Sequence, residues 1–275
     1  MTPAVWLLVL LGALTSFGGA VGGIGGATLL VPVLLLTGMD IIDAAPLGLL
    51  SVAATSLAAA GRQLDAGLVH HRIGLTVELA ASSFAIAGAL LSTSVPAPWL
   101  ARALGLGALT GAVVTLSRRG NRNPSNQTFR DDSPGEWPGT LGGTYHFGDA
   151  SVPYHAQHVP LGLAVAAVAG AISGMAGVGG GFLTTPAMSE VMHVPVKVAA
   201  ATSTFTMGIT AAAGLLVFAG QGRIDATSGA AVVLGAMGGA TIGSRVQTGL
   251  PATRARTVTG VLLILVAAVV IGRSL

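Results

Sequence analysis

The sequence of 275 residues contains no cysteine and few charged residues. Without cysteine, disulfide bonds, thiol catalysis and cysteine-ligated metal or iron–sulfur centres are excluded. Charged residues make up 8% of the chain, whereas a soluble domain carries roughly 25%. No zinc-protease, nucleophile-elbow or nucleotide P-loop motif occurs in the sequence. We therefore expect neither a soluble domain nor an enzyme, and no cofactor, metal site or nucleic-acid partner.

Apolar sequence is abundant instead, with 52% hydrophobic residues and a mean hydropathy of +0.79. Several runs approach the roughly 20 residues that cross a bilayer. The 41 glycines suit closely packed or broken membrane helices. This composition predicts an all-α polytopic membrane protein, in contact with the lipid bilayer. We interpret Ala4–Val21 as a retained first helix, because no Lys or Arg precedes it as in a signal peptide.

Two glycine motifs share the pattern G-[IV]-G-G-x-x-L-x-x-P, 154 residues apart, at Gly23–Pro32 and Gly177–Pro186. A second pair of matching segments follows in the same order, Ala53–Ser56 and Ala200–Ser203, 147 residues apart. Matches that keep their order at nearly constant offset predict an internal duplication. Chance matching in a chain rich in Ala and Gly is the alternative.

Each half contains five apolar segments, the second of them short and broken by Gly and Pro. In the first half they are Ala4–Val21, Thr28–Thr37, Ala44–Ala60, Ile73–Val95 and Trp99–Leu116; in the second half Leu161–Met175, Phe182–Met192, Val196–Phe218, Ala226–Val246 and Thr257–Ile271. We divide the chain into a first membrane repeat (1–116), a polar cytoplasmic linker (117–158) and a second membrane repeat (159–275). An odd number of segments per half predicts two repeats of inverted topology. In the linker, Thr144–Phe147 and Val152–His155 flank Gly148-Asp149, a pattern that favours a small hairpin.

The basic residues indicate how the chain is threaded. If the short segments cross, ten of the 13 Lys and Arg residues fall on one side of the membrane: Arg62, Arg72, Arg118, Arg119, Arg122, Arg130, Lys197, Arg245, Arg254 and Arg256. If the short segments dip in and return, the ratio falls to about eight against five. The positive-inside rule therefore favours ten crossing segments, a cytoplasmic linker and both termini outside. Helices this short cover only about 15–18 Å of a core of roughly 30 Å, which places the breaks inside the membrane.

The paired breaks are the candidate substrate site. Short Gly- and Pro-interrupted segments at matching places in two halves point to the binding site of a transporter. Freed backbone N–H groups at helix starts carry a partial positive charge and favour an anion. The candidate residues are Gly23, Gly25, Gly26, Gly177, Gly179, Gly180 and Gly181. Tight helix packing is the alternative, disfavoured here because Pro32 and Pro186 are expected to break their helices.

Hydroxyl side chains lie in the matching segments that follow. Thr55, Ser56, Thr202 and Ser203 are candidates to donate to a bound oxyanion, although such hydroxyls commonly bond to their own helix. Glu78 is a candidate carrier of a coupling proton; snorkelling toward the surface near Arg72 is equally consistent with the sequence. Glu190, His193 and Lys197 are interpreted as interfacial.

Two half-repeats that each carry G-[IV]-G-G-x-x-x-x-x-P followed by A-A-T-S resemble the sulfite exporter TauE/SafE family, from Ala4 to Ile271. The resemblance implies a bacterial or archaeal plasma-membrane permease for sulfite, sulfonates or related organic sulfur anions. The first motif departs from the second in having Ala27 where the second has Gly181. The residues by themselves indicate a secondary transporter of a small anion. The alternatives are a passive anion channel or a membrane component without transport, and a homodimer is a candidate assembly.

Overall fold

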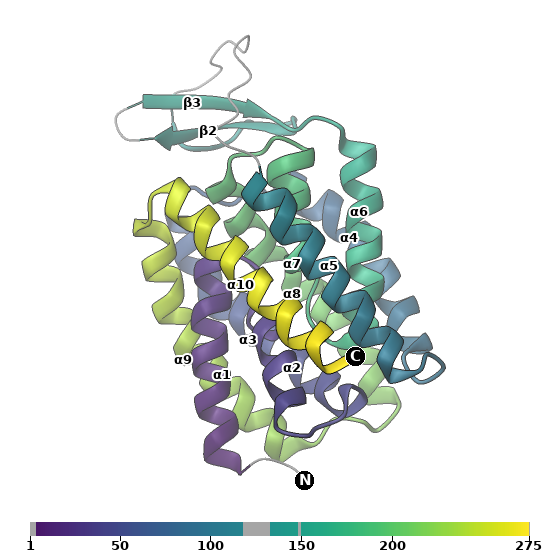
Figure 1. Ribbon diagram of the computed structural model, residues 1–275. Coiled ribbons are helices and arrows are strands. Elements are labelled where there is room, and N and C mark those ends of the chain that lie inside the picture. The colour runs from purple at the N-terminus through teal and green to yellow at the C-terminus, as the bar shows by residue number, and fades with distance from the viewer. Residues whose placement is uncertain (1–3, 118–132, 148–149, 275) are drawn as a thin grey trace.

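The structure is a computed structural model that describes residues 4–117, 133–147 and 150–274. A bundle of helices carries a small sheet at one end (Figure 1). The helices before the sheet are α1 (Val5–Gly22), α2 (Gly26–Leu36), α3 (Ile41–Asp65), α4 (His71–Leu91) and α5 (Ala97–Ser117). The strands are β1 (Gly135–Glu136), β2 (Gly142–Phe147) and β3 (Ala150–His155). After the sheet come α6 (Val159–Ala176), α7 (Gly181–Pro186), the π-helix η1 (Ala187–Val191), α8 (Val196–Gly220), α9 (Ala226–Gly249) and α10 (Ala252–Ser274).

Eight of the described helices are long and apolar enough to cross a membrane, judged by length and composition. Large apolar side chains project from their outer faces, among them Leu57, Leu79 and Leu216, each more than two-thirds exposed. In water such surfaces are unfavourable, whereas in a bilayer they meet lipid tails. The predicted class, an all-α polytopic membrane protein, is confirmed.

Each of the two short segments reverses the direction of the chain. Helix α2 folds back along α1, and α7 with η1 folds back along α6 (Figure 1). The Gln157 N–H, just before α6, donates to the Met192 carbonyl just after η1 at 2.9 Å. Each short element therefore returns to the side from which the preceding long helix entered, as ten crossings would also require. Only eight of the described helices have the length to cross, so full crossing by the short segments stays a prediction. The loop after each short element therefore lies on the same side of the membrane as it would if the long helix and the short element each crossed completely.

Basic residues gather at the end of the bundle that carries the sheet, called here the sheet end. Lys197 Nζ donates to the Thr248 carbonyl at 3.1 Å, and Arg62 Nε contacts Thr248 Oγ1 at 3.4 Å. The end of α3, the start of α8 and the end of α9 therefore meet there. Arg118, Arg119, Arg122 and Arg130 lie outside the described residues. That the sheet end faces the cytoplasm stays a prediction from the positive-inside rule.

The expected role of the prolines needs correction. Pro32 lies inside α2, which continues to Leu36. Pro186 ends α7, and the chain continues as the π-helix η1. A proline without an N–H removes one i→i−4 bond, and a wider turn accommodates that loss. The helices are interrupted at the glycine segments 23–25 and 177–180. The prolines lie inside the short helices that follow these segments and change only their local geometry.

The long helices pack in pairs that correspond between the two halves of the chain. Helix α1 packs on α9 as α6 packs on α4, and α3 packs on α9 as α8 packs on α4. Helix α5 packs against α10. Two of these interfaces rest on glycines spaced by four. Gly235 and Gly239 lie against the backbone of Val9 and Ala13, and Gly170 and Gly174 lie against the backbone of Ala81 and Ala85. Such small-residue spacing lets membrane helices approach closely. Helix-packing glycines therefore exist outside the two motifs. Motif glycines also pack closely, since a Cβ added to Gly177 would meet the Ala45 backbone and one added to Gly23 would meet Ala200.

The sheet is antiparallel with strand order β1-β2-β3. Strands β2 and β3 contain the two segments predicted to form a hairpin, whereas Gly148-Asp149 lie outside the described residues. Tyr145 and Tyr154 are buried against the sheet ends of α4, α6 and α8. The fully buried His70 joins the sheet to α4, because its Nδ1 accepts the Ile73 N–H at 3.2 Å and its Nε2 donates to the Gly142 carbonyl at 3.0 Å. Burial lowers the pKa of His70.

The glycine contacts between α1 and α9 yield a prediction. We expect Gly239→Val to lower the unfolding temperature in detergent, since a side chain there meets the Ala13 backbone and overpacking costs about 1–3 kcal/mol. Gly238→Val is the matched control, because an added Cβ at Gly238 meets nothing within 4 Å. Differential scanning fluorimetry of the two variants makes the comparison. Equal shifts in both would show that α1 and α9 are not held by this close contact.

Candidate functional site

At the first break, the backbone N–H groups of residues 23–25 are already hydrogen-bonded to the end of α1. Gly23 adopts a left-handed conformation with φ of +68°, and its N–H turns back to the Ala20 carbonyl at 3.4 Å. The N–H groups of Ile24 and Gly25 both donate to the Gly19 carbonyl, at 3.0 and 3.3 Å. The expectation that Gly23 and Gly25 present free N–H groups is therefore wrong, because these groups finish α1. Gly26 begins α2, where the first N–H groups have no partner within the helix.

The second break leaves more donors open. Gly177 has φ of +72° and donates its N–H to the Ser173 carbonyl at 2.7 Å, so it too ends a helix. Gly179 has φ of +71°, and Gly181 begins α7. Within the described chain, no hydrogen-bond acceptor is recorded for the N–H groups of Val178, Gly179 and Gly180. These three consecutive donors are the strongest candidates for binding an anion.

The two breaks touch each other. Thr28 Oγ1 in α2 donates to the Ile24 carbonyl at 2.7 Å and lies 3.2 Å from the Val178 carbonyl of the second break. Thr185 Oγ1 in α7 donates to the Gly23 carbonyl of the first break at 2.5 Å. Residues 150 or more positions apart thus satisfy each other's exposed carbonyls, and the structure joins the two glycine motifs in one junction.

The junction lies at the middle of two long helices. A Cβ added to Gly179 would lie 2.6 Å from Val52 Cγ2 of α3, and one added to Gly25 would lie 2.6 Å from Met207 Sδ of α8. Val52 and Met207 are each the twelfth of 25 residues in their helices. A helix of that length covers about 37 Å, so its midpoint lies deep in the hydrocarbon core. Both side chains are buried and fill the space between the breaks.

The four predicted hydroxyls have different surroundings. Ser203 Oγ pairs with Thr184 Oγ1 of α7 at 3.0 Å, so it reaches the second break. Ser56 Oγ donates to the Phe205 carbonyl of α8 at 2.7 Å. Thr202 Oγ1 accepts the His70 N–H at 2.9 Å and faces α4. Thr55 is fully buried, and its hydroxyl has no hydrogen-bond partner among the described residues.

Glu78 is buried inside the bundle, with 4% of its surface exposed. Its Oε1 accepts the Thr210 N–H of α8 at 2.8 Å and also the Thr210 hydroxyl. The side chain therefore faces α8 and does not snorkel toward the surface near Arg72. Thr210 follows Met207 by one helical turn, which places the carboxylate one layer away from the junction.

A buried ion pair was not anticipated. Glu190 of η1 is 3% exposed and pairs with Arg256 of α10, with Oε1 and Nη2 2.6 Å apart. Arg256 Nε also donates to the Thr115 carbonyl near the end of α5 at 2.8 Å. The pair ties η1 to α10 and α5, and the interpretation of Glu190 as interfacial stays a prediction. No sequence pattern signals a contact between residues 66 positions apart.

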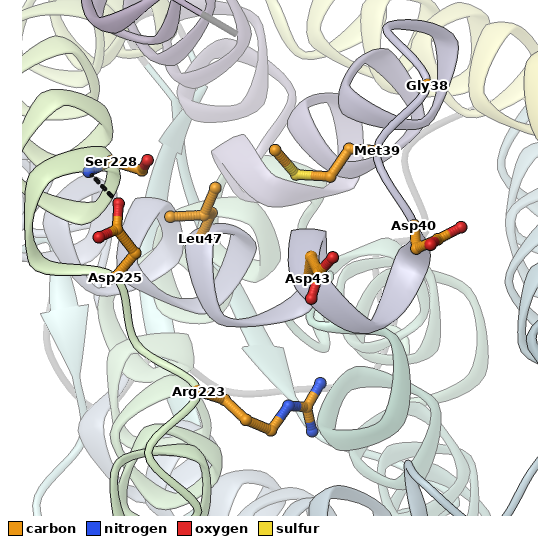
Figure 2. Close-up of a pocket in the computed structure, with 8 residues that line it drawn as sticks. All are labelled: Gly38, Met39, Asp40, Asp43, Leu47, Arg223, Asp225 and Ser228. Atoms are coloured by element: carbon orange, nitrogen blue, oxygen red, sulfur yellow. Dashed lines mark hydrogen bonds between the residues drawn. The ribbon is translucent and has the colours of Figure 1, made fainter. Parts of the chain in front are cut away.

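A cavity of about 290 Å³ opens at the end opposite the sheet (Figure 2). Its charged lining consists of Asp40, Asp43 and Asp225 with Arg223. Asp225 accepts the Ser228 N–H at 2.8 Å as the N-cap of α9. Arg223 donates to the Ile42 carbonyl and, at 2.9 Å, to Ser92 Oγ. Three carboxylates against one guanidinium do not favour an anion, so the junction remains the better candidate site.

Within the described residues, eight helices of membrane-spanning length and two short broken segments define a polytopic membrane protein. The family model described as sulfite exporter TauE/SafE matches residues 8–270, and the chain belongs to this family. The "Probable membrane transporter protein YunE" of Bacillus subtilis (strain 168) is 25% identical over 256 residues, which cover 88% of each chain. No solved structure matches this chain. The resemblance inferred from the glycine motifs is thereby confirmed, and the family is one of membrane transporters and not an enzyme class.

Proposed function

We propose that this protein is a secondary transporter of a small anion of the sulfite, sulfonate or related organic sulfur class. The anion binds at the junction of the two helix breaks. The observation that carries the proposal is the run of unpaired N–H groups at Val178, Gly179 and Gly180, buried at the point where both breaks meet. Membership of the TauE/SafE family supports the substrate class.

The electrostatics of the junction favour negative charge. The N-termini of α2 and α7 converge there, and each contributes a partial positive charge from its first turn. In the apolar core this charge is weakly screened. Gly26 and residues 178–181 supply backbone donors, while Thr55 supplies a buried hydroxyl that has no partner among the described residues. The hydroxyls of Ser56, Thr202 and Ser203 already have protein partners, so we do not expect them to donate to the anion.

Transport requires the junction to open. Met207 lies against both breaks, since a Cβ on Gly181 would come 3.0 Å from its Cε. An unbranched methionine repacks at low cost, so an entering anion displaces Met207 and not the branched Val52. The reciprocal helix pairing supports two inverted repeats, and rocking one repeat against the other exposes the junction to alternate sides. The Glu190–Arg256 pair joins η1 to α10 at the sheet end, and we expect it to break when the junction opens to that side.

Flux measurements in proteoliposomes test the proposal. We expect uptake of labelled sulfite or an alkyl sulfonate that is stimulated by the same anion preloaded on the opposite side. Such counterflow requires alternating access. Flux without counterflow would instead identify an anion channel. Absence of anion-dependent flux under every ion or pH gradient would contradict transport by this chain.

A glycine substitution at the second break separates binding from backbone strain. Gly179 and Gly222 have nearly equal left-handed φ angles, +71° and +68°, so alanine imposes similar backbone strain at both. Only at Gly179 does the added Cβ meet a neighbour, Val52. We expect Gly179→Ala to reduce anion flux at least about tenfold, which corresponds to roughly 1.4 kcal/mol, while Gly222→Ala retains it. Equal flux in the two variants, at matched protein abundance, would contradict a binding role for the second break.

Glu78 provides a test of proton coupling. Glu78→Gln keeps an oxygen that accepts from Thr210 but removes the titratable proton. We expect this variant to lose stimulation of flux by a pH gradient and to retain counterflow. Glu136→Gln, a carboxylate outside the membrane helices, serves as the control. Gradient-driven flux that persists in Glu78→Gln would exclude Glu78 as the carrier.

A further inference from the structure

A pair of serines lies beside the first break. Ser16 of α1 and Ser51 of α3 are fully buried, with their Oγ atoms 3.0 Å apart. A Cβ added to Gly26 would contact both hydroxyls and would lie 2.8 Å from Ser51 Oγ. The pair therefore borders the first residue of α2, where backbone N–H groups have no partner within the helix.

The two serine hydroxyls carry one proton that is not used in a hydrogen bond within the described residues. Two hydroxyls carry two protons, and the bond between Ser16 and Ser51 uses one of them. Hydroxyls in helices commonly donate to a carbonyl one turn back, as Thr15 does to Leu11 at 2.6 Å. No such bond is recorded for Ser16 or Ser51 in the described residues. One O–H group of the pair is thus available to another acceptor.

Thr55 lies on the face of α3 that lines the junction. Three earlier residues of this face, spaced by three or four, contact the breaks: Ala45 and Gly48 lie against Gly177, and Val52 lies against Gly25 and Gly179. Thr55 is the next residue on the same stripe. Its hydroxyl is fully buried and unpaired within the described structure. Burying an unpaired hydroxyl is unfavourable, and a bound acceptor would recover that cost.

At the second break, by contrast, the hydroxyl protons already have acceptors within the protein. Thr184 and Ser203 also form a hydroxyl pair at 3.0 Å, but Thr184 Oγ1 has a further acceptor in the Gly180 carbonyl at 3.1 Å. Ser203 donating to Thr184, and Thr184 donating to Gly180, uses both protons. The second break offers backbone donors, and the first break offers unused hydroxyls.

We propose that Ser16, Ser51 and Thr55 bind the oxygen atoms of the transported anion at the start of α2 and select oxyanions over halides. The inference rests on the proposed function and adds to it the residues that determine selectivity. Donors from α1, from α3 and from the α2 backbone approach from different directions. An anion with several oxygens accepts from all of them, whereas a chloride ion has no separate oxygens to match their positions.

Kinetics of sulfite flux test the assignment. We expect Thr55→Val and the double variant Ser16→Ala/Ser51→Ala each to raise the KM for labelled sulfite at least about tenfold and to weaken discrimination against competing chloride. Thr55→Ser should restore the wild-type KM. Ser203→Ala at the second break is the matched control, with a change in KM below about threefold. Thr55→Val should leave the unfolding temperature unchanged or raise it, because it removes an unpaired buried hydroxyl.

The outcomes separate the two proposals. Wild-type sulfite flux with an unchanged KM in Thr55→Val and in the double variant overturns the hydroxyl assignment alone. A rise in KM that is as large in Ser203→Ala overturns the assignment of selectivity to the first break. A lowered unfolding temperature in Thr55→Val, with KM unchanged, assigns Thr55 a structural role. Absence of any wild-type flux of sulfite or sulfonate overturns both the transport function and this inference.

Discussion

An interrupted helix inside a bilayer must satisfy its backbone polar groups within the protein, because lipid offers no partner. This chain meets the requirement by bringing two interruptions together, so that Thr28 and Thr185 each bond to a carbonyl of the opposite break. The remaining helices keep this junction in place. Close glycine contacts join α1 to α9 and α6 to α4, while α3 and α8 pass the junction at their midpoints.

The junction binds, in our account, through dipoles and hydroxyls and without a cationic side chain. A full positive charge in the hydrocarbon core is costly and holds an anion too firmly for release. Two buried or half-buried arginines of the described residues act elsewhere. Arg256 pairs with Glu190 at the sheet end, and Arg223 contacts the start of α3 and the end of α4 at the opposite end. Backbone donors with a few hydroxyls give weaker, reversible binding, as transport requires.

The sequence predicts the location of this junction better than its bonding. The repeated glycine motif identifies both breaks, and the second matching segment places Ser203 against Thr184 of the second break. Which N–H groups stay free depends on how Gly23 and Gly177 close their helices, a property of φ angles that the motif does not encode. The Ser16–Ser51 and Glu190–Arg256 contacts join residues 35 and 66 positions apart, and no local pattern signals such pairs.

The most direct test is to locate the anion. Selenite and selenate are heavier oxyanions of sulfur-like chemistry, and their selenium is found by anomalous diffraction from crystals of the protein grown with either ion. The account predicts one principal peak at the junction, within hydrogen-bond reach of the N–H groups of Gly179 and Gly180 and of the Thr55 hydroxyl. A peak in the cavity lined by Asp43 and Arg223, with none at the junction, would contradict it.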